Sequence, residues 1–103
     1  FANFDRGVPD GSTIDTDGCI WNCRYGGSCI VRFDPNGKVD QLIEMPVKNI
    51  TNCIFGGSDM KTLFITTASN KGNDQHELDG SIFSVNLNYQ GLEDHKSKIN
   101  INA

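Results

Sequence analysis

Few residues in this sequence have side chains suited to chemistry, and the first is an aspartate in a Pro-Asp-Gly segment. Asp10 stands between Pro9 and Gly11, near the start of the 103 residues. A carboxylate can ligate a hard divalent cation and can accept a proton from water held beside that cation. Pro-Asp-Gly is also a common turn sequence, and these three residues alone favour a turn over a functional site.

Other polar groups give weaker signals. Asp15-Thr16-Asp17-Gly18 has the opening pattern of a calcium loop, but the remaining spacing and the closing glutamate are missing, so we expect a hairpin turn. His76 lies in a polar stretch over residues 70–79, which is typical of a surface loop. His76 or the neighbouring Glu77 would touch a substrate only if this loop covered the mouth of a substrate channel. His95 is expected on the surface, and no pairing of a histidine with a nucleophile is supported.

The four cysteines match none of the usual zinc spacings. They are Cys19, Cys23, Cys29 and Cys53. On an extended strand Cys19 and Cys23 share one face with Trp21 between them, as small core residues do. We therefore expect reduced, buried thiols, with a disulfide framework as the alternative. Asn49-Ile50-Thr51 fits the glycosylation pattern, but a chance match is the simpler reading. A cytoplasmic location is expected.

The composition narrows the partners. The formal net charge is -4, and the nine lysines and arginines form no basic stripe, so nucleic acid is not expected. No apolar run approaches the length of a membrane span, and no membrane association is expected. An acidic balance suits a divalent cation, although it also serves solubility alone.

Short apolar stretches between turn signals predict an all-β fold. The expected strands are 12–15, 19–24, 29–33 and 38–45, and then 52–55, 63–67, 81–87 and 96–101. Laying Gly18–Trp21 over Lys61–Phe64 gives two units of related layout, in which Trp21 and Phe64 hold corresponding core positions. Repeats of about 40 to 50 residues with four short strands are typical of propeller blades.

The expected organisation is therefore a partial β-propeller over residues 1–103, with one four-stranded blade at about 8–48 and another at about 49–103. Two blades alone would leave apolar faces in water, so the sequence is expected to belong to something larger. A single β-sandwich of seven or eight strands is the structural alternative.

Several segments, in order, resemble the senescence marker protein/regucalcin/gluconolactonase family of sugar lactonases. They are Val8-Pro9-Asp10-Gly11 with Gly18-Cys19-Ile20-Trp21, Ile30-Val31-Arg32-Phe33-Asp34-Pro35, Thr51-Asn52-Cys53-Ile54-Phe55-Gly56-Gly57, Leu63-Phe64-Ile65-Thr66-Thr67-Ala68 and Gly80-Ser81-Ile82-Phe83. The resemblance runs from about Val8 to Val85 and corresponds to the C-terminal portion of such proteins.

This resemblance implies a six-bladed propeller that opens sugar lactones with one bound divalent cation (Ca, Zn, Mn or Mg). It implies that Asp10 is a metal ligand and the general base. The family's other metal ligands, a glutamate and an asparagine, and its substrate-binding residues belong to earlier blades that this sequence lacks. Asp10 is therefore the one residue of this sequence to which the resemblance assigns a site role, and one carboxylate cannot hold a catalytic cation.

Three hypotheses follow. The first is part of a lactonase, inactive alone and completed by missing blades. The second is a homo-oligomer in which three copies form a six-bladed ring and Asp10 of each copy meets near the axis. The third is a non-enzymatic calcium-binding or interaction module of the regucalcin type. Whether the chain itself is an enzyme stays open among them.

Overall fold

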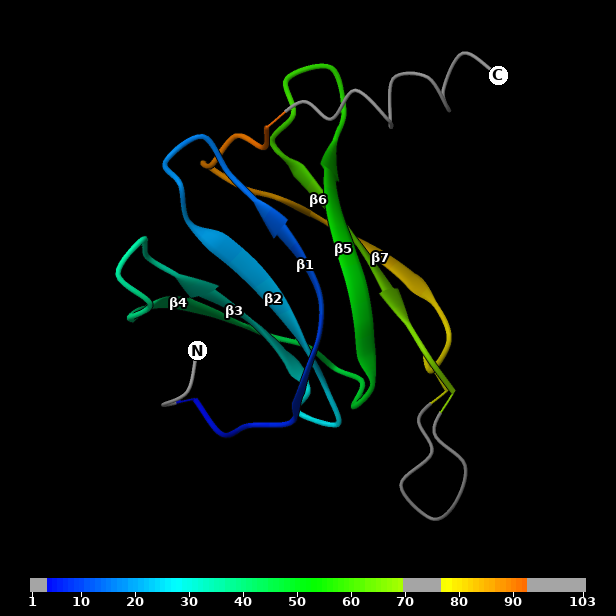
Figure 1. The fold of residues 1–103 in the computed structure, drawn as a ribbon. Helices are drawn as coiled ribbons and strands as arrows, with labels where there is room; N and C mark the ends of the chain where they lie inside the picture. The colour runs from blue at the N-terminus through cyan, green and yellow to red at the C-terminus, as the bar shows by residue number, and fades with distance from the viewer. Residues whose placement is uncertain (1–3, 70–76, 93–103) are drawn as a thin grey trace.

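The computed structural model describes residues 4–69 and 77–92, which form two antiparallel β-sheets packed face to face (Figure 1). The first sheet has the order β1-β2-β3-β4 and the second has the order β5-β6-β7. The strands are β1 (Val8–Ile14), β2 (Ile20–Tyr25), β3 (Cys29–Phe33), β4 (Val39–Glu44), β5 (Ile50–Gly56), β6 (Thr62–Thr67) and β7 (Ile82–Asn86). The expected all-β class is confirmed.

Tight turns join the strands of the first sheet into a meander. In the turn between β3 and β4, the Asp34 carboxylate accepts hydrogen bonds from the backbone N–H groups of Asn36 and Lys38. Gly37 closes this turn at a φ of 84°, a conformation that costs little only for glycine. Asp15–Gly18 forms the turn between β1 and β2, as expected, with the Gly18 N–H bonded to the Asp15 carbonyl.

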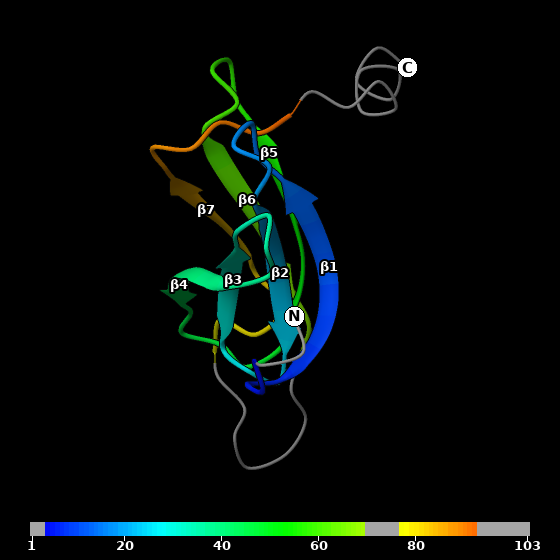
Figure 2. The ribbon, with the colours of Figure 1, turned by 60° about the vertical axis from the view of Figure 1, so that its left-hand side comes forward.

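The core lies between the two sheets. Residues two apart on β2, β5 and β6 point into it, as a period of two requires. It consists of Trp21, Cys23, Ile30, Val47, Ile50, Cys53, Phe55, Leu63 and Ile65. The first strands of the two sheets, β1 and β5, lie side by side, as Figures 1 and 2 both show. This side-by-side placement of the two first strands agrees with the two neighbouring units expected from the sequence.

Seven of the eight expected strands occur in the described residues, with ends shifted by a few residues. The largest shift is at β1, which begins at Val8 rather than Ser12, because the Pro-Asp-Gly segment continues the strand. The strand expected over 96–101 lies outside the described residues, as do His76 and His95. In the described part of the chain, no helix is long and apolar enough to cross a membrane.

Trp21 is in the core, fully buried, but the matching expectation for Phe64 is wrong within this chain. Phe64 alternates with the buried Leu63 and Ile65, so it points away from the first sheet and is 39% exposed. Trp21, by contrast, points from the first sheet toward the second. Trp21 therefore lies between the two sheets, whereas Phe64 lies on the face of the second sheet that no described sheet covers.

Candidate functional site

Asp10 lies in a β-bulge near the start of β1. Pro9 pairs with Arg24 and Ser12 pairs with Asn22, so Asp10 and Gly11 together oppose the single residue between them, Cys23. A bulge bends its strand and re-aims the side chains it carries, and bulges are over-represented beside active sites. The Asp10 side chain is exposed. The segment is therefore a strand irregularity, not a turn, and it presents a carboxylate to solvent.

The neighbouring strand β5 carries an irregularity at the matching place. Ile50 pairs with Thr67 and Asn52 pairs with Thr66, which leaves Thr51 as the extra residue. The two bulges are in contact: a Cβ atom placed on Gly11 would overlap the Asn52 side chain and lie 2.8 Å from the Thr51 carbonyl oxygen. Gly11 is thus required because no side chain fits between β1 and β5 at this point.

Asn22 holds the β1 bulge from the side of β2. Its Nδ2 atom donates to the Asp10 carbonyl oxygen at 3.0 Å and to the Ser12 hydroxyl oxygen at 2.7 Å. The residue is only 5% exposed, although it lies in the middle of a strand. Sequence reasoning missed it. The available signal was an asparagine inside an apolar strand, a position at which this residue type is depleted.

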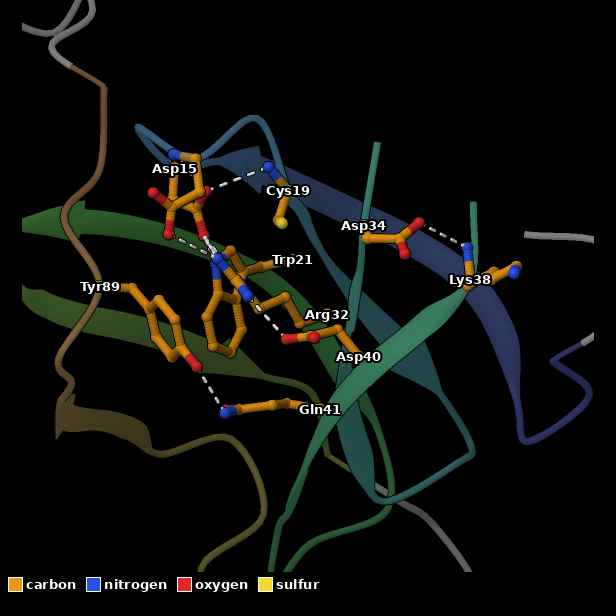
Figure 3. A network of polar contacts seen from close by, with 10 residues as sticks. Asp15, Cys19, Trp21, Arg32, Asp34, Lys38, Asp40, Gln41 and Tyr89 are labelled. Atoms are coloured by element: carbon orange, nitrogen blue, oxygen red, sulfur yellow. Dashed lines mark hydrogen bonds and ion pairs between the residues drawn. The ribbon is translucent and has the colours of Figure 1, made fainter. Parts of the chain in front are cut away.

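A second polar group lies at the other end of the first sheet and centres on buried Asp15 (Figure 3). Its carboxylate accepts hydrogen bonds from the Trp21 indole N–H at 2.9 Å, from the Cys19 backbone N–H at 3.0 Å and from Arg32 Nε at 2.9 Å. Burial opposes ionisation most strongly, but these hydrogen bonds together outweigh it and lower the pKa of Asp15.

Arg32 extends this group to Tyr89, in the segment that follows β7. Its guanidinium forms ion pairs with Asp17 at 3.1 Å and Asp40 at 2.6 Å, and it lies 3.9 Å from the centre of the Tyr89 ring. Tyr89 also packs on Trp21, with ring centres 5.5 Å apart. Both carboxylate oxygens of Asp15 accept hydrogen bonds within the fold, so Asp15 is not a free binding site. The contacts of Tyr89 with Arg32 and Trp21 join the two sheets.

The thiols contribute no chemistry to either place. All four cysteines are free and buried, as expected. A hydrogen bond with Cys53 and burial both raise the pKa of the Cys23 thiol, and burial raises the pKa of the Cys19 and Cys29 thiols. Because the thiolate is the reactive form, these residues act as small core side chains.

The described residues do not complete a metal site. Over residues 4–69 and 77–92, no group of three or more histidine, cysteine, aspartate or glutamate side chains could hold a metal ion. Asp10 contributes one carboxylate, with the Asn52 amide of β5 beside Gly11. Oxygen donors of this kind suit Ca²⁺ or Mg²⁺, but a stable site needs further ligands. Asp10 fits as a contributor to a cation site, not as the whole of one.

Comparison with known proteins gives a consistent result. The model of the SMP-30/Gluconolactonase/LRE-like region matches residues 1–69. The 6-deoxy-6-sulfogluconolactonase of Pseudomonas putida is 33% identical over 95 residues, which are 88% of this chain and 33% of that protein. The regucalcin of Danio rerio is 45% identical over 65 residues, or 62% of this chain and 22% of that protein.

Solved structures show the same relationship. A calcium-binding protein, regucalcin from Agrobacterium tumefaciens, superposes with a TM-score of 0.78 at 29% identity and covers 87% of this chain and 32% of its own. The luciferin-regenerating enzyme superposes with a TM-score of 0.74 at 26% identity, over 84% of this chain and 30% of its own. The chain spans between about a fifth and about a third of the length of the curated relatives that it matches.

Proposed function

The chain belongs to the SMP-30/gluconolactonase/LRE-like family, and we propose that it forms two neighbouring blades of a β-propeller that hydrolyses sugar lactones. The observation that carries this proposal is the position of Asp10. Its exposed carboxylate lies on a bulge where the first strands of the two sheets meet. In a propeller this is the wall of the central channel, where side chains of several blades converge.

Lactone hydrolysis requires a group that activates water. The Asp10 carboxylate would accept a proton from the attacking water as its oxygen bonds to the lactone carbonyl carbon. The ring C–O bond then breaks, and the ring oxygen takes up a proton to give the open hydroxy acid. The exposure of Asp10 favours this role, because a general base must reach both water and substrate.

The family's divalent cation would be held by Asp10 together with oxygen ligands from outside the described residues. When bound, such a cation supplies polarisation of the lactone carbonyl and charge stabilisation of the developing oxyanion. Which of Ca, Zn, Mn and Mg occupies it stays open. Since Asp10 is one ligand, we propose that the chain is inactive alone and that its cation site is completed by other blades.

The far face of the second sheet supports the need for further blades. Ile54 and Phe64 are cross-strand partners on this face and are 48% and 39% exposed, and Ile82 beside them is 73% exposed. Contiguous apolar side chains of this kind mark a surface that another element covers. The cover is another blade of the same propeller or, as the second candidate, a copy of this chain in a three-chain ring.

A graft tests the proposal. The chain replaces the segment that it matches in the Pseudomonas putida 6-deoxy-6-sulfogluconolactonase, and hydrolysis of that enzyme's own lactone is measured. We expect the graft to be active and the chain alone to be at the background rate. A folded graft without hydrolysis would contradict the lactonase proposal. If that graft still bound Ca²⁺, the non-enzymatic calcium-binding module would be favoured instead.

A cytoplasmic location stays a prediction, with which four reduced thiols agree.

A further inference from the structure

The β1 bulge creates a local problem that one buried side chain solves. Between the Pro9–Arg24 and Ser12–Asn22 pairs, the backbone ladder of β1 and β2 is interrupted. The peptide that joins Asp10 to Gly11 lies in this interruption, and an extra residue in a bulge is left without its ladder partner. Asn22 supplies the missing contact, because its amide donates to the Asp10 carbonyl and to the Ser12 hydroxyl, one on each side of Gly11.

This contact is made at a cost to stability. The Asn22 Oδ1 atom is buried and has no hydrogen-bond partner among the described residues. A buried acceptor without a partner destabilises a fold, and an apolar or β-branched side chain would suit the middle of β2 better. An unsatisfied group in a native structure calls for an explanation, and a requirement other than stability is one.

The same peptide is confined from its other side. At Gly11, the Thr51 carbonyl and the Asn52 side chain of β5 lie too close to admit even a Cβ atom. The Asp10–Gly11 peptide is therefore held between the Asn22 amide and β5. Together with the Pro9–Arg24 pair on the other side of Asp10, a fixed Asp10–Gly11 peptide plane restricts the direction in which the Asp10 side chain leaves the strand.

We propose that Asn22 is a positioning residue. Its hydrogen bond to the backbone carbonyl of Asp10 holds the Asp10 carboxylate in its working orientation. The inference rests on the proposed function for the role of Asp10. Asn22 itself is buried behind the strand and would act through Asp10, without touching the substrate. A misplacement of about 1 Å at a catalytic group can lower a rate by roughly 100-fold.

The first test measures backbone order in the full chain by ¹⁵N relaxation. The Gly11 amide belongs to the peptide that carries the Asp10 carbonyl. Its order parameter therefore reports directly whether Asn22 holds this peptide, a contact that we call the clamp. We expect about 0.85 in the native chain and below about 0.6 in Asn22→Leu, which keeps the shape but removes the donor. The urea midpoint should change little, because loss of the two hydrogen bonds is offset by removal of the unpaired acceptor.

Asn86→Leu is the matched control. Asn86 accepts a hydrogen bond from the Thr62 hydroxyl at 2.9 Å across β6 and β7, away from the bulge, so its loss should leave Gly11 ordered. If Asn22→Leu does not fold, Asn22→Val is measured instead, since a β-branched residue suits a strand. An ordered Gly11 in either folded Asn22 variant would overturn the clamp.

The second test measures kinetics in the active graft. We expect Asn22→Leu to lower kcat by about 10- to 100-fold with KM changed less than about twofold, because orientation and not binding is lost. Unchanged kcat in a variant with a disordered Gly11 would overturn the positioning role. An inactive unsubstituted graft would instead count against the lactonase proposal, and the order parameters would still decide whether Asn22 holds the bulge.

Discussion

At the scale of single residues, the site depends on Gly11 as much as on Asp10. Gly11 permits β1 and β5 to approach, and the approach brings two bulged strands together beside an exposed carboxylate. A carboxylate of this kind is found by its place in a Pro-Asp-Gly segment. The requirement for glycine beside it is a matter of contact between two strands about 40 residues apart in the chain.

Replacing this glycine therefore has a defined consequence. Gly11→Ala should lower the free energy of unfolding by about 1–3 kcal/mol, because the added methyl group meets the Thr51 backbone and the Asn52 side chain. Urea denaturation of the chain measures the loss. Adding Asn52→Ala should recover part of it, since one of the two obstructing groups is then gone. Full stability of Gly11→Ala would show that β1 and β5 are not in contact there.

How far the Asp10 site could be predicted also has a residue-scale answer. Its position in the chain follows from the resemblance of the Pro-Asp-Gly segment and its flanks to a lactonase family. Its bulge does not follow, because Pro-Asp-Gly is compatible with a turn as well, and only the pairing of Pro9 with Arg24 decides between them. Asn22 was missed because its two acceptors lie on another strand.

At the scale of elements, the two sheets are joined by the network around Asp15. The strands themselves were predictable, since turn residues such as Asp34-Pro35-Asn36-Gly37 separate apolar segments of suitable length. How one sheet meets the other was not, because Tyr89 reaches Arg32 and Trp21 from beyond the last described strand. Side-chain networks between distant segments leave no periodic pattern in a sequence.

Removing the central carboxylate should loosen this joint. Asp15→Asn leaves the buried Arg32 without its innermost charged partner and should lower the free energy of unfolding by about 3–5 kcal/mol. Asp17→Asn removes an exposed partner of the same guanidinium and should cost no more than about 1 kcal/mol. Thermal or urea unfolding compares the two, and equal losses would argue against a buried Asp15–Arg32 pair.

The same carboxylate makes stability depend on pH. Because the folded state lowers the pKa of Asp15, the charged form is favoured by folding. This stabilisation is fully present above the pKa of the unfolded chain, about 3.9, and is lost as the pH falls through the lower folded value. The difference in unfolding free energy between the native chain and Asp15→Asn should therefore shrink below about pH 4. A difference independent of pH would contradict an ionised Asp15.

At the scale of the whole molecule, the outer face of the second sheet agrees with the proposal that further blades cover it. The apolar side chains Ile54, Phe64 and Ile82 are exposed on the second sheet. On the opposite face of the first sheet, Arg24 is 1% exposed, and its Nε and Nη2 atoms have no hydrogen-bond partner in the described part of the chain. Burial lowers the pKa of Arg24, although the guanidinium lies over the Phe4 ring at 4.8 Å.

Arg24 has no ion pair among residues 4–69 and 77–92, where its Nη1 atom donates to the Phe4 carbonyl oxygen at 3.4 Å, and this gives a further prediction. In the chain alone, Arg24→Met should raise the free energy of unfolding by about 1–2 kcal/mol, because a charge that is costly to desolvate is replaced by an apolar side chain of similar length. Urea denaturation at neutral pH provides the measurement. A loss of several kcal/mol would contradict this prediction, because the contacts of Arg24 with the Phe4 and Phe33 rings would then outweigh the cost of burying its charge.

The central claim is that this two-blade unit supplies the working carboxylate of a lactonase, and the effect of Asp10→Asn on kcat/KM of the graft tests it most directly. We expect kcat/KM to fall by about 100-fold or more, the usual contribution of a general base. Asp59→Asn, an exposed aspartate in the turn between β5 and β6, should leave kcat/KM unchanged. Full activity in a folded Asp10→Asn graft would mean that Asp10 is not the general base and that the chemistry belongs to residues of the other blades.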